Sequence, residues 1–143
     1  MEIKIAETSQ EIDNCYSVML QLRPHLTRPE FVSRIQAQMQ NGYILVFVKN
    51  HHQIVSLAGC RIGNNLAWGR FLYIDDLVSD ANHRSQGWCK YIFRWLLDYA
   101  KSNHCQQIHL DSGIQRLEAH QFYLHEGMEM TGYHFFLQLS RSG

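Results

Sequence analysis

One stretch of the chain decides its fold: Asp75-Asp76-Leu77-Val78-Ser79-Asp80-Ala81-Asn82-His83-Arg84-Ser85-Gln86-Gly87-Trp88-Cys89-Lys90. It begins inside a mostly apolar run, Phe71 to Ser79, whose composition predicts a strand buried on both faces. It ends inside the run from Gln86 to Lys101, where apolar residues recur at the spacing of an amphipathic helix. A strand, a polar loop and a helix are therefore predicted to follow one another here.

The start of this helix has the features of an anion-binding site. The first amides of a helix point outward and its dipole favours negative charge, so the amides from about Ser85 to Lys90 suit a pyrophosphate. Gly87 has no Cβ and lets the backbone approach a phosphate closely. Arg84 and Lys90 can add charge-assisted hydrogen bonds.

The flanking sequence predicts further strands and helices. Strands are predicted at 1–5, 43–49, 54–62, 71–79, 107–111 and 130–139, and helices at 9–23, 29–40, 86–101 and 115–125. This order, β-α-α-β-β-β-α-β-α-β, predicts an α/β (α+β) fold: a mixed, mostly antiparallel central sheet with helices on both faces. The 143 residues are predicted to form a single domain, 1–143.

Composition and charge narrow the class of protein. Lysine plus arginine and aspartate plus glutamate total 13 each, so neither nucleic acid nor a membrane is predicted as a partner. The four cysteines form no CxxC pair, and the N-terminus has no long apolar run, which together favour the cytoplasm. The nine histidines show no metal-ligand spacing, so no metal is predicted.

Two segments resemble the Gcn5-related N-acetyltransferases. Arg84-x-x-Gly87-x-Cys89 looks like the family signature (Gln/Arg)-x-x-Gly-x-(Gly/Ala), whose loop grips the pyrophosphate of coenzyme A. Ala119 to Met128 resembles the family helix with a small residue, an aromatic-Tyr pair and a later glycine. The chain departs from the pattern at Cys89, which is larger than Gly or Ala, at the bulky Trp88, and at Arg116, where many relatives have Asn.

The resemblance implies the GNAT fold and acetyl-coenzyme A (acetyl-CoA) as co-substrate. It also implies that the backbone of Leu77 to Ser79 binds the pantetheine amides as an added strand would, where the next strand splays away. The cofactor-binding residues expected from the loop, this strand and the later helix are Leu77, Val78, Ser79, Arg84, Ser85, Gln86, Gly87, Trp88, Cys89, Lys90, Arg116 and Ala119.

Tyr123, Asp75 and Asp76 are the candidate catalytic residues. The resemblance implies that Tyr123 protonates the departing thiolate, and that Asp75 is the first candidate for the base that deprotonates the amine, with Asp76 second. Successive strand residues point to opposite faces, so only one of the two enters a given cleft unless a bulge intervenes. The alternative is a structural pair of acids that form salt bridges, with Arg70 or Arg116 as partners.

The acceptor is predicted to be a primary amine. Residues 22–31, including Arg23, His25 and Arg28, and the aromatic tail at 133–136 are expected to form the acceptor mouth, and the two acids to favour a cation. Polyamine, aminoglycoside, lysine side chain and small amine all stay open. The tail at 133–139 also offers an edge for a homodimer.

A catalytically idle coenzyme A-binding module is the rival hypothesis, favoured by Cys89 and Arg116. A third hypothesis, a toxin that acts on aminoacyl-tRNA, is disfavoured by the balanced charge.

Overall fold

The structure, a computed structural model, describes residues 1–140. Its elements in chain order are β1 (Glu2–Ile5), α1 (Ser9–Asn14), α2 (Tyr16–Leu22), α3 (Arg28–Met39), β2 (Tyr43–Asn50), β3 (Gln53–Asn65), β4 (Gly69–Ser79), the 3-10 turn η1 (Ala81–His83), α4 (Trp88–Ser102), β5 (Gln107–Leu110) and α5 (Leu117–His125). The chain forms two compact units, Met1–Leu110 and the segment from Asp111 onward. No helix among residues 1–140 is long and apolar enough to cross a membrane.

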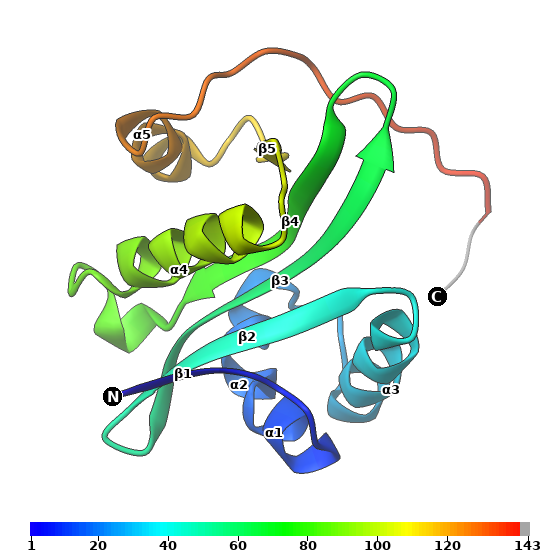
Figure 1. The fold of residues 1–143 in the computed structure, drawn as a ribbon. Coiled ribbons are helices and arrows are strands. Elements are labelled where there is room, and N and C mark those ends of the chain that lie inside the picture. Colours follow the sequence, from blue (N-terminus) through cyan, green and yellow to red (C-terminus); the bar gives the residue numbers. More distant parts are fainter. Residues whose placement is uncertain (141–143) are drawn as a thin grey trace. The chain divides into compact units, whose positions relative to one another are not determined.

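The first unit is built on one five-stranded sheet in the order β1-β2-β3-β4-β5 (Figure 1). Neighbouring strands from β1 to β4 pair antiparallel, whereas β4 and β5 pair parallel. The predicted mixed, mostly antiparallel sheet is therefore confirmed. The parallel pair needs a long crossover, and α4 supplies it.

Helices cover both faces of this sheet, as predicted (Figure 1). On one face, Ile12 of α1, Met19 of α2 and Phe31 of α3 pack in one core cluster with Leu45 and Phe47 of β2. On the other face α4 buries its apolar stripe, Ile92, Phe93, Leu96 and Ala100. Each large apolar side chain buried in this way contributes about 1.5–3 kcal/mol. These two cores fix the position of β4, which lies between them.

Capping decides where the N-terminal helices begin. Thr8 and Thr27 each accept a hydrogen bond from the amide three residues later and form a capping box with Glu11 and Glu30. The single helix predicted from Ser9 is split at the fully buried Cys15 into α1 and α2. The helix predicted from Gln86 begins at Trp88 because Gly87 adopts a left-handed conformation, φ 84°.

The strand predicted at Met130–Leu139 is not formed within the described residues, so this prediction is wrong. The tail has the β-propensity and the alternating apolar side chains of a strand, but a strand exists only through hydrogen bonds to a neighbouring strand. Instead Tyr133, Phe135, Leu137 and Leu139 are each at least 80% exposed. Apart from the split of the first helix into α1 and α2, the predicted element order therefore holds up to α5 and fails after it.

Candidate active site

A β-bulge in the middle of β4 brings the two candidate acids together. Gly59 of β3 pairs with Asp76 and the next residue, Cys60, pairs with Ile74, so Asp75 has no partner opposite it on β3. A bulge breaks the strict alternation of side chains along a strand. As a result Asp75 and Asp76 both line one cavity of about 440 Å³, together with Arg23, Gln38, Asn41, Tyr43 and Arg61.

Asp76 is held by the two residues that face it. The hydroxyl of the buried Tyr43 donates to Oδ2 of Asp76 at 2.8 Å. Nε and Nη2 of Arg23 both lie 2.9 Å from Oδ1 of Asp76, and Nη2 also donates to the backbone oxygen of Asp75 at 2.8 Å. Burial, together with the neighbouring Asp76 carboxylate, raises the pKa of Tyr43 well above its ordinary value, so this phenol stays a donor.

Gly59 of β3 leaves the space that Tyr43 needs to reach Asp76. A Cβ atom at Gly59 would lie 1.6 Å from the hydroxyl oxygen of Tyr43 and 2.3 Å from its Cζ. The ring of Tyr43 therefore occupies the space above Gly59, and only glycine at this position of β3 allows the hydroxyl to reach Asp76.

Asp75 forms its own ion pair with Arg61. Nε of Arg61 lies 3.0 Å from Oδ2 of Asp75, and Nη2 lies 3.3 Å from Oδ1. Burial raises the pKa of Asp75 even though the Arg61 guanidinium acts in the opposite direction. The partners suggested from the sequence are corrected here: Asp75 and Asp76 pair with Arg61 and Arg23, while Nε of Arg70 donates to the backbone oxygen of Asn103 at 2.7 Å.

The strand β4 continues past its parallel neighbour. The pairing between β4 and β5 runs from Phe71 opposite Gln107 to Ile74 opposite Leu110 and stops there. On the β5 side, the residues of β4 from Asp75 to Ser79 have no strand partner within residues 1–140. Leu77, Val78 and Ser79 lie on this unpaired edge, which therefore has backbone groups available for an extended ligand.

The loop after β4 is fixed by polar contacts before the helix begins. Nδ1 of His83 lies 2.6 Å from Oδ2 of Asp80. The side chain of Gln21, at the end of α2, donates to Oδ1 of Asp80 at 2.7 Å and accepts from the Ala81 amide at 2.8 Å. Burial opposes ionisation of Asp80, but the hydrogen bonds from Gln21 and His83 prevail and lower its pKa. Sequence analysis did not find Gln21, because its contact spans 59 residues of chain.

The rest of this loop leads into α4 with an unusual backbone. Ser85 and Gly87 both have positive φ, 66° and 84°, and no side chain caps the start of α4. The predicted pyrophosphate residues therefore follow one another through the end of the loop and into the first turn of α4: Arg84, Ser85, Gln86, Gly87, Trp88, Cys89 and Lys90. Nε1 of Trp88 donates to Oε1 of Gln86 at 3.1 Å, which holds the bulky indole against its own loop.

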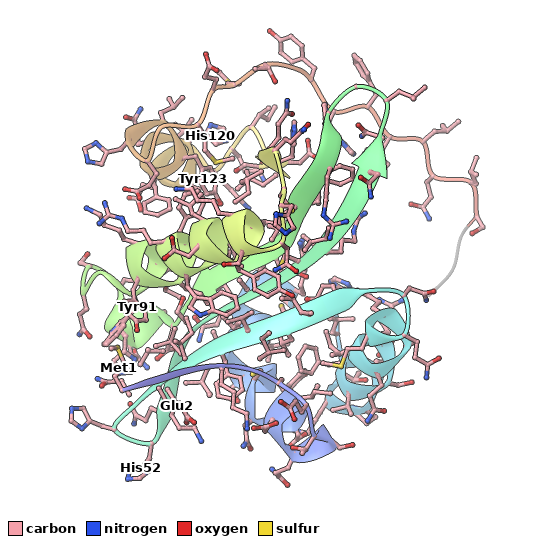
Figure 2. All side chains as sticks on the ribbon, in the orientation of Figure 1. Met1, Glu2, His52, Tyr91, His120 and Tyr123 are labelled. Carbon is pink, nitrogen blue, oxygen red and sulfur yellow. The ribbon has the colours of Figure 1, made fainter. Side chains whose placement is uncertain are left out.

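The three remaining predicted residues belong to the second unit. Arg116 occupies the N-cap position of α5, and Ala119 and Tyr123 lie on the helix itself. Figure 2 shows His120 and Tyr123 on α5, and Nε2 of His120 lies 2.8 Å from the backbone oxygen of Gly113. Tyr123 is half-buried and contacts the ring of Phe122 edge-on, with 5.7 Å between the ring centroids.

Comparisons with known proteins identify the family. Residues 7–128 match the Acetyltransferase (GNAT) family. The chain is 30% identical over 124 residues to the uncharacterized N-acetyltransferase YhdJ of Bacillus subtilis (strain 168), covering 86% of this chain and 87% of that protein.

Solved structures share the fold. An acetyltransferase of Trypanosoma brucei superimposes with a TM-score of 0.80 at 21% identity, covering 96% of this chain and 99% of its own. The aminoglycoside N-acetyltransferase AAC(6')-Iy in complex with CoA gives a TM-score of 0.82 at 12% identity, covering 96% and 94%.

Fold and family together define the class of this protein as an acetyltransferase. The chain belongs to the Acetyltransferase (GNAT) family, so both the resemblance recognised in the sequence and its prediction of an enzyme are confirmed. The family match spans β4, the loop after it, α4 and α5, which together with Arg116 at the N-cap of α5 include all the predicted site residues.

Proposed function

We propose that this acetyltransferase transfers the acetyl group of acetyl-CoA to a primary amine by direct attack, with both substrates bound at once. The observation that supports this most is the bulge at Asp75, because it turns two carboxylates toward one cavity. An alkylammonium group has a pKa near 10.4, so its deprotonation is a large share of the barrier at neutral pH. A carboxylate beside the amine, acting directly or through water, meets this need.

The acyl donor is proposed to lie along β4 and the loop that follows. The unpaired edge at Leu77, Val78 and Ser79 suits the amides of the pantetheine arm, and the turn from Arg84 to Lys90 suits the pyrophosphate. The positive φ of Gly87 supports this assignment, because the turn it forms presents the first amides of α4 toward solvent. Arg116 and Ala119 are also proposed as cofactor-binding residues, on the family resemblance alone.

Asp75 is proposed as the base in preference to Asp76. Asp76 accepts hydrogen bonds from two residues, Arg23 and the buried Tyr43, whereas the side chain of Asp75 accepts from Arg61 alone among residues 1–140. Burial raises the pKa of Asp75, and a base whose pKa lies closer to the working pH accepts a proton more effectively. In the proposed step the amine nitrogen attacks the thioester carbonyl carbon, the C–S bond breaks, Asp75 takes the amine proton and Tyr123 gives a proton to the thiolate.

Two isosteric substitutions test these roles. Asp75→Asn and Tyr123→Phe should each lower kcat by about 10²–10⁴-fold, the usual contribution of a positioned acid or base. The dissociation constant for coenzyme A, measured by calorimetry, should change by less than about threefold, because neither side chain is assigned to hold the cofactor. Asp98→Asn and Tyr99→Phe on α4 are the matched controls, with thiol release as the assay.

Three results would each reject part of the proposal. Turnover by Tyr123→Phe equal to that of the parent enzyme at every pH removes Tyr123 from the mechanism. Failure of the parent protein to bind coenzyme A or acetyl-CoA at millimolar concentration removes the site itself. If the protein binds acetyl-CoA but releases no thiol with any amine of a broad panel, the result would support the rival hypothesis of a non-catalytic coenzyme A-binding module.

A cytoplasmic location, a homodimer and the lack of a nucleic-acid or membrane partner stay predictions. The tail expected to offer the dimer edge forms no strand within residues 1–140, but its side chains are exposed, with Tyr133 and Phe135 at 89% and 90%. None of the four cysteines forms a disulfide within residues 1–140.

A further inference from the structure

A second cavity adjoins the one that holds the two acids. It measures about 300 Å³ and shares Arg23, Gln38 and Asp76 with the first. The residues that line only the second cavity are Met19, His25, Leu26, Phe31, Arg34 and Ile35. Cavities of about 300–1,000 Å³ accommodate small molecules. The two cavities together therefore form a site with an acidic end and a second end beside α3.

The polar wall of this site is one stripe of α3. Arg34 and Gln38 lie one helical turn apart, and Asn41 follows just after the helix ends. Phe31 and Ile35 of the same helix are buried in the core, which fixes the rotation of α3. Phe31 and Ile35 line the second cavity too, so their packing fixes Arg34, which lies next to them on the helix, beside that cavity.

The charges around the two cavities do not cancel. Three arginines line them, but only two aspartates do. Arg61 pairs with Asp75 and Arg23 pairs with Asp76, so each acid already has its own guanidinium partner. The charge left over is that of Arg34, which has no ion pair or hydrogen bond with the described part of the chain.

The carboxylate closest along the chain to Arg34, that of Glu30, accepts hydrogen bonds from another residue, Thr27. Glu30 lies one turn earlier on α3 and feels the charge of Arg34, but its Oε1 accepts from the hydroxyl of Thr27 at 2.8 Å and from the Thr27 amide in the capping box. Glu30 lines neither cavity. Arg34 therefore has no direct ion pair within residues 1–140, and its guanidinium lines the second cavity, where it disfavours an acceptor that has only positive charge.

We propose that the acceptor is a small primary amine that also has an anionic group, a carboxylate or a phosphate, bound by Arg34. This inference rests on the proposed function, because it assumes that the amine faces Asp75 and Asp76. The amine end of such a molecule meets the two acids, and its anion meets the planar donor fork of Arg34, which matches carboxylate and phosphate oxygens. The exposed amide of Gln38, common to both cavities, lies between the two ends.

Pairs of amines that differ only in the anionic group test this inference. The pairs are ethanolamine with O-phosphoethanolamine, glucosamine with glucosamine 6-phosphate, and cadaverine with L-lysine. Binding to the coenzyme A-loaded protein is measured by calorimetry, and kcat/KM by thiol release from acetyl-CoA. We expect the anionic member of at least one pair to bind tenfold or more tightly than its partner, since a hydrogen bond to a charged group typically contributes that much. The phosphate and carboxylate pairs distinguish the two kinds of anion.

Arg34→Gln is the decisive variant, and Lys101→Gln is its matched control. Lys101 lies in the last turn of α4 and lines neither cavity. Its substitution by glutamine removes one positive charge, as Arg34→Gln does. Arg34→Gln should abolish most of the preference for the anionic member, and Lys101→Gln should preserve it. Preference that survives Arg34→Gln, or equal binding within every pair, would overturn the inference.

The inference and the proposed function fail in different ways. Equal acetylation of the charged and uncharged members supports the acetyl transfer and rejects the anionic acceptor. Preferential binding of an anionic member, lost in Arg34→Gln but without thiol release, supports the anion site and rejects the proposed reaction for these amines.

Discussion

The substitution Gly59→Ala probes the contact on which the geometry of Asp76 depends. The added methyl group would lie 1.6 Å from the hydroxyl oxygen, 2.3 Å from Cζ and 2.7 Å from Cε2 of Tyr43, so the ring has to move. Moving it breaks the 2.8 Å hydrogen bond to Asp76 and disturbs a side chain that is only 3% exposed. The backbone at Gly59 has no positive φ, so alanine fits the strand itself.

The expected cost follows from these two losses. A hydrogen bond to a charged group contributes about 1.5–3 kcal/mol, and overpacking a core typically costs about 1–3 kcal/mol. The free energy of unfolding should therefore fall by about 3–5 kcal/mol, and the melting temperature by about 10 °C or more. Urea unfolding followed by fluorescence gives the change in free energy. Gly132→Ala is the control, because a Cβ atom there meets nothing within 4 Å.

A double-mutant cycle identifies the cause. In a Tyr43→Ala background the ring is gone, so Gly59→Ala should cost less than about 0.5 kcal/mol or stabilise the strand. If Gly59→Ala alone is as stable as the parent protein, or if its full cost persists without the Tyr43 ring, the argument from the 1.6 Å contact is refuted.

Two further predictions concern the loop and the N-terminus. Gln21→Leu removes the hydrogen bonds that the Gln21 side chain makes with Asp80 and Ala81. The affinity for coenzyme A, measured by calorimetry, should therefore fall about three- to tenfold, while the helix content measured by circular dichroism changes little. Unchanged affinity would contradict this role of Gln21. The hydrogen bond to Lys4 and those from the Glu7 and Thr8 amides lower the pKa of Glu11 from 4.5 to about 2, so its stabilisation is complete above pH 4.5 and is lost as the pH falls toward 2. Urea midpoints of Glu11→Gln and the parent should therefore differ at pH 7 and converge near pH 2, whereas a constant difference would contradict this origin.

The sequence was sufficient for those parts of the fold that depend on local pattern. The apolar stripe of α4, the polar loop before it and the run that forms β4 follow from spacing and composition between Phe71 and Lys101. The family assignment rests on the same stretch, with support from the helix around Tyr123. Backbone amides at the start of a helix are present whatever the side chains are, which is why this half of the candidate site could be proposed from the sequence.

The other half depends on contacts that no local pattern contains. The bulge at Asp75 arises from the register between β3 and β4, and alternation within β4 alone predicts that the two acids diverge. The partners of the acids are likewise distant, since Arg23 and Asp76 are 53 residues apart. The strand predicted at 130–139 is wrong for the opposite reason. Its apolar and polar residues alternate clearly, but a strand forms only when it can pair with a neighbouring strand.

The end of α2 contacts both halves of the site at once. Gln21 holds the loop at Asp80, and two residues later Arg23 holds Asp76 in the cavity. A shift of this one helical end on filling either half would alter the other, and thermodynamic reciprocity would then require each substrate to change the affinity of its partner by the same factor. The coupling between the two proposed substrates is thus a property that this one helical end is positioned to set.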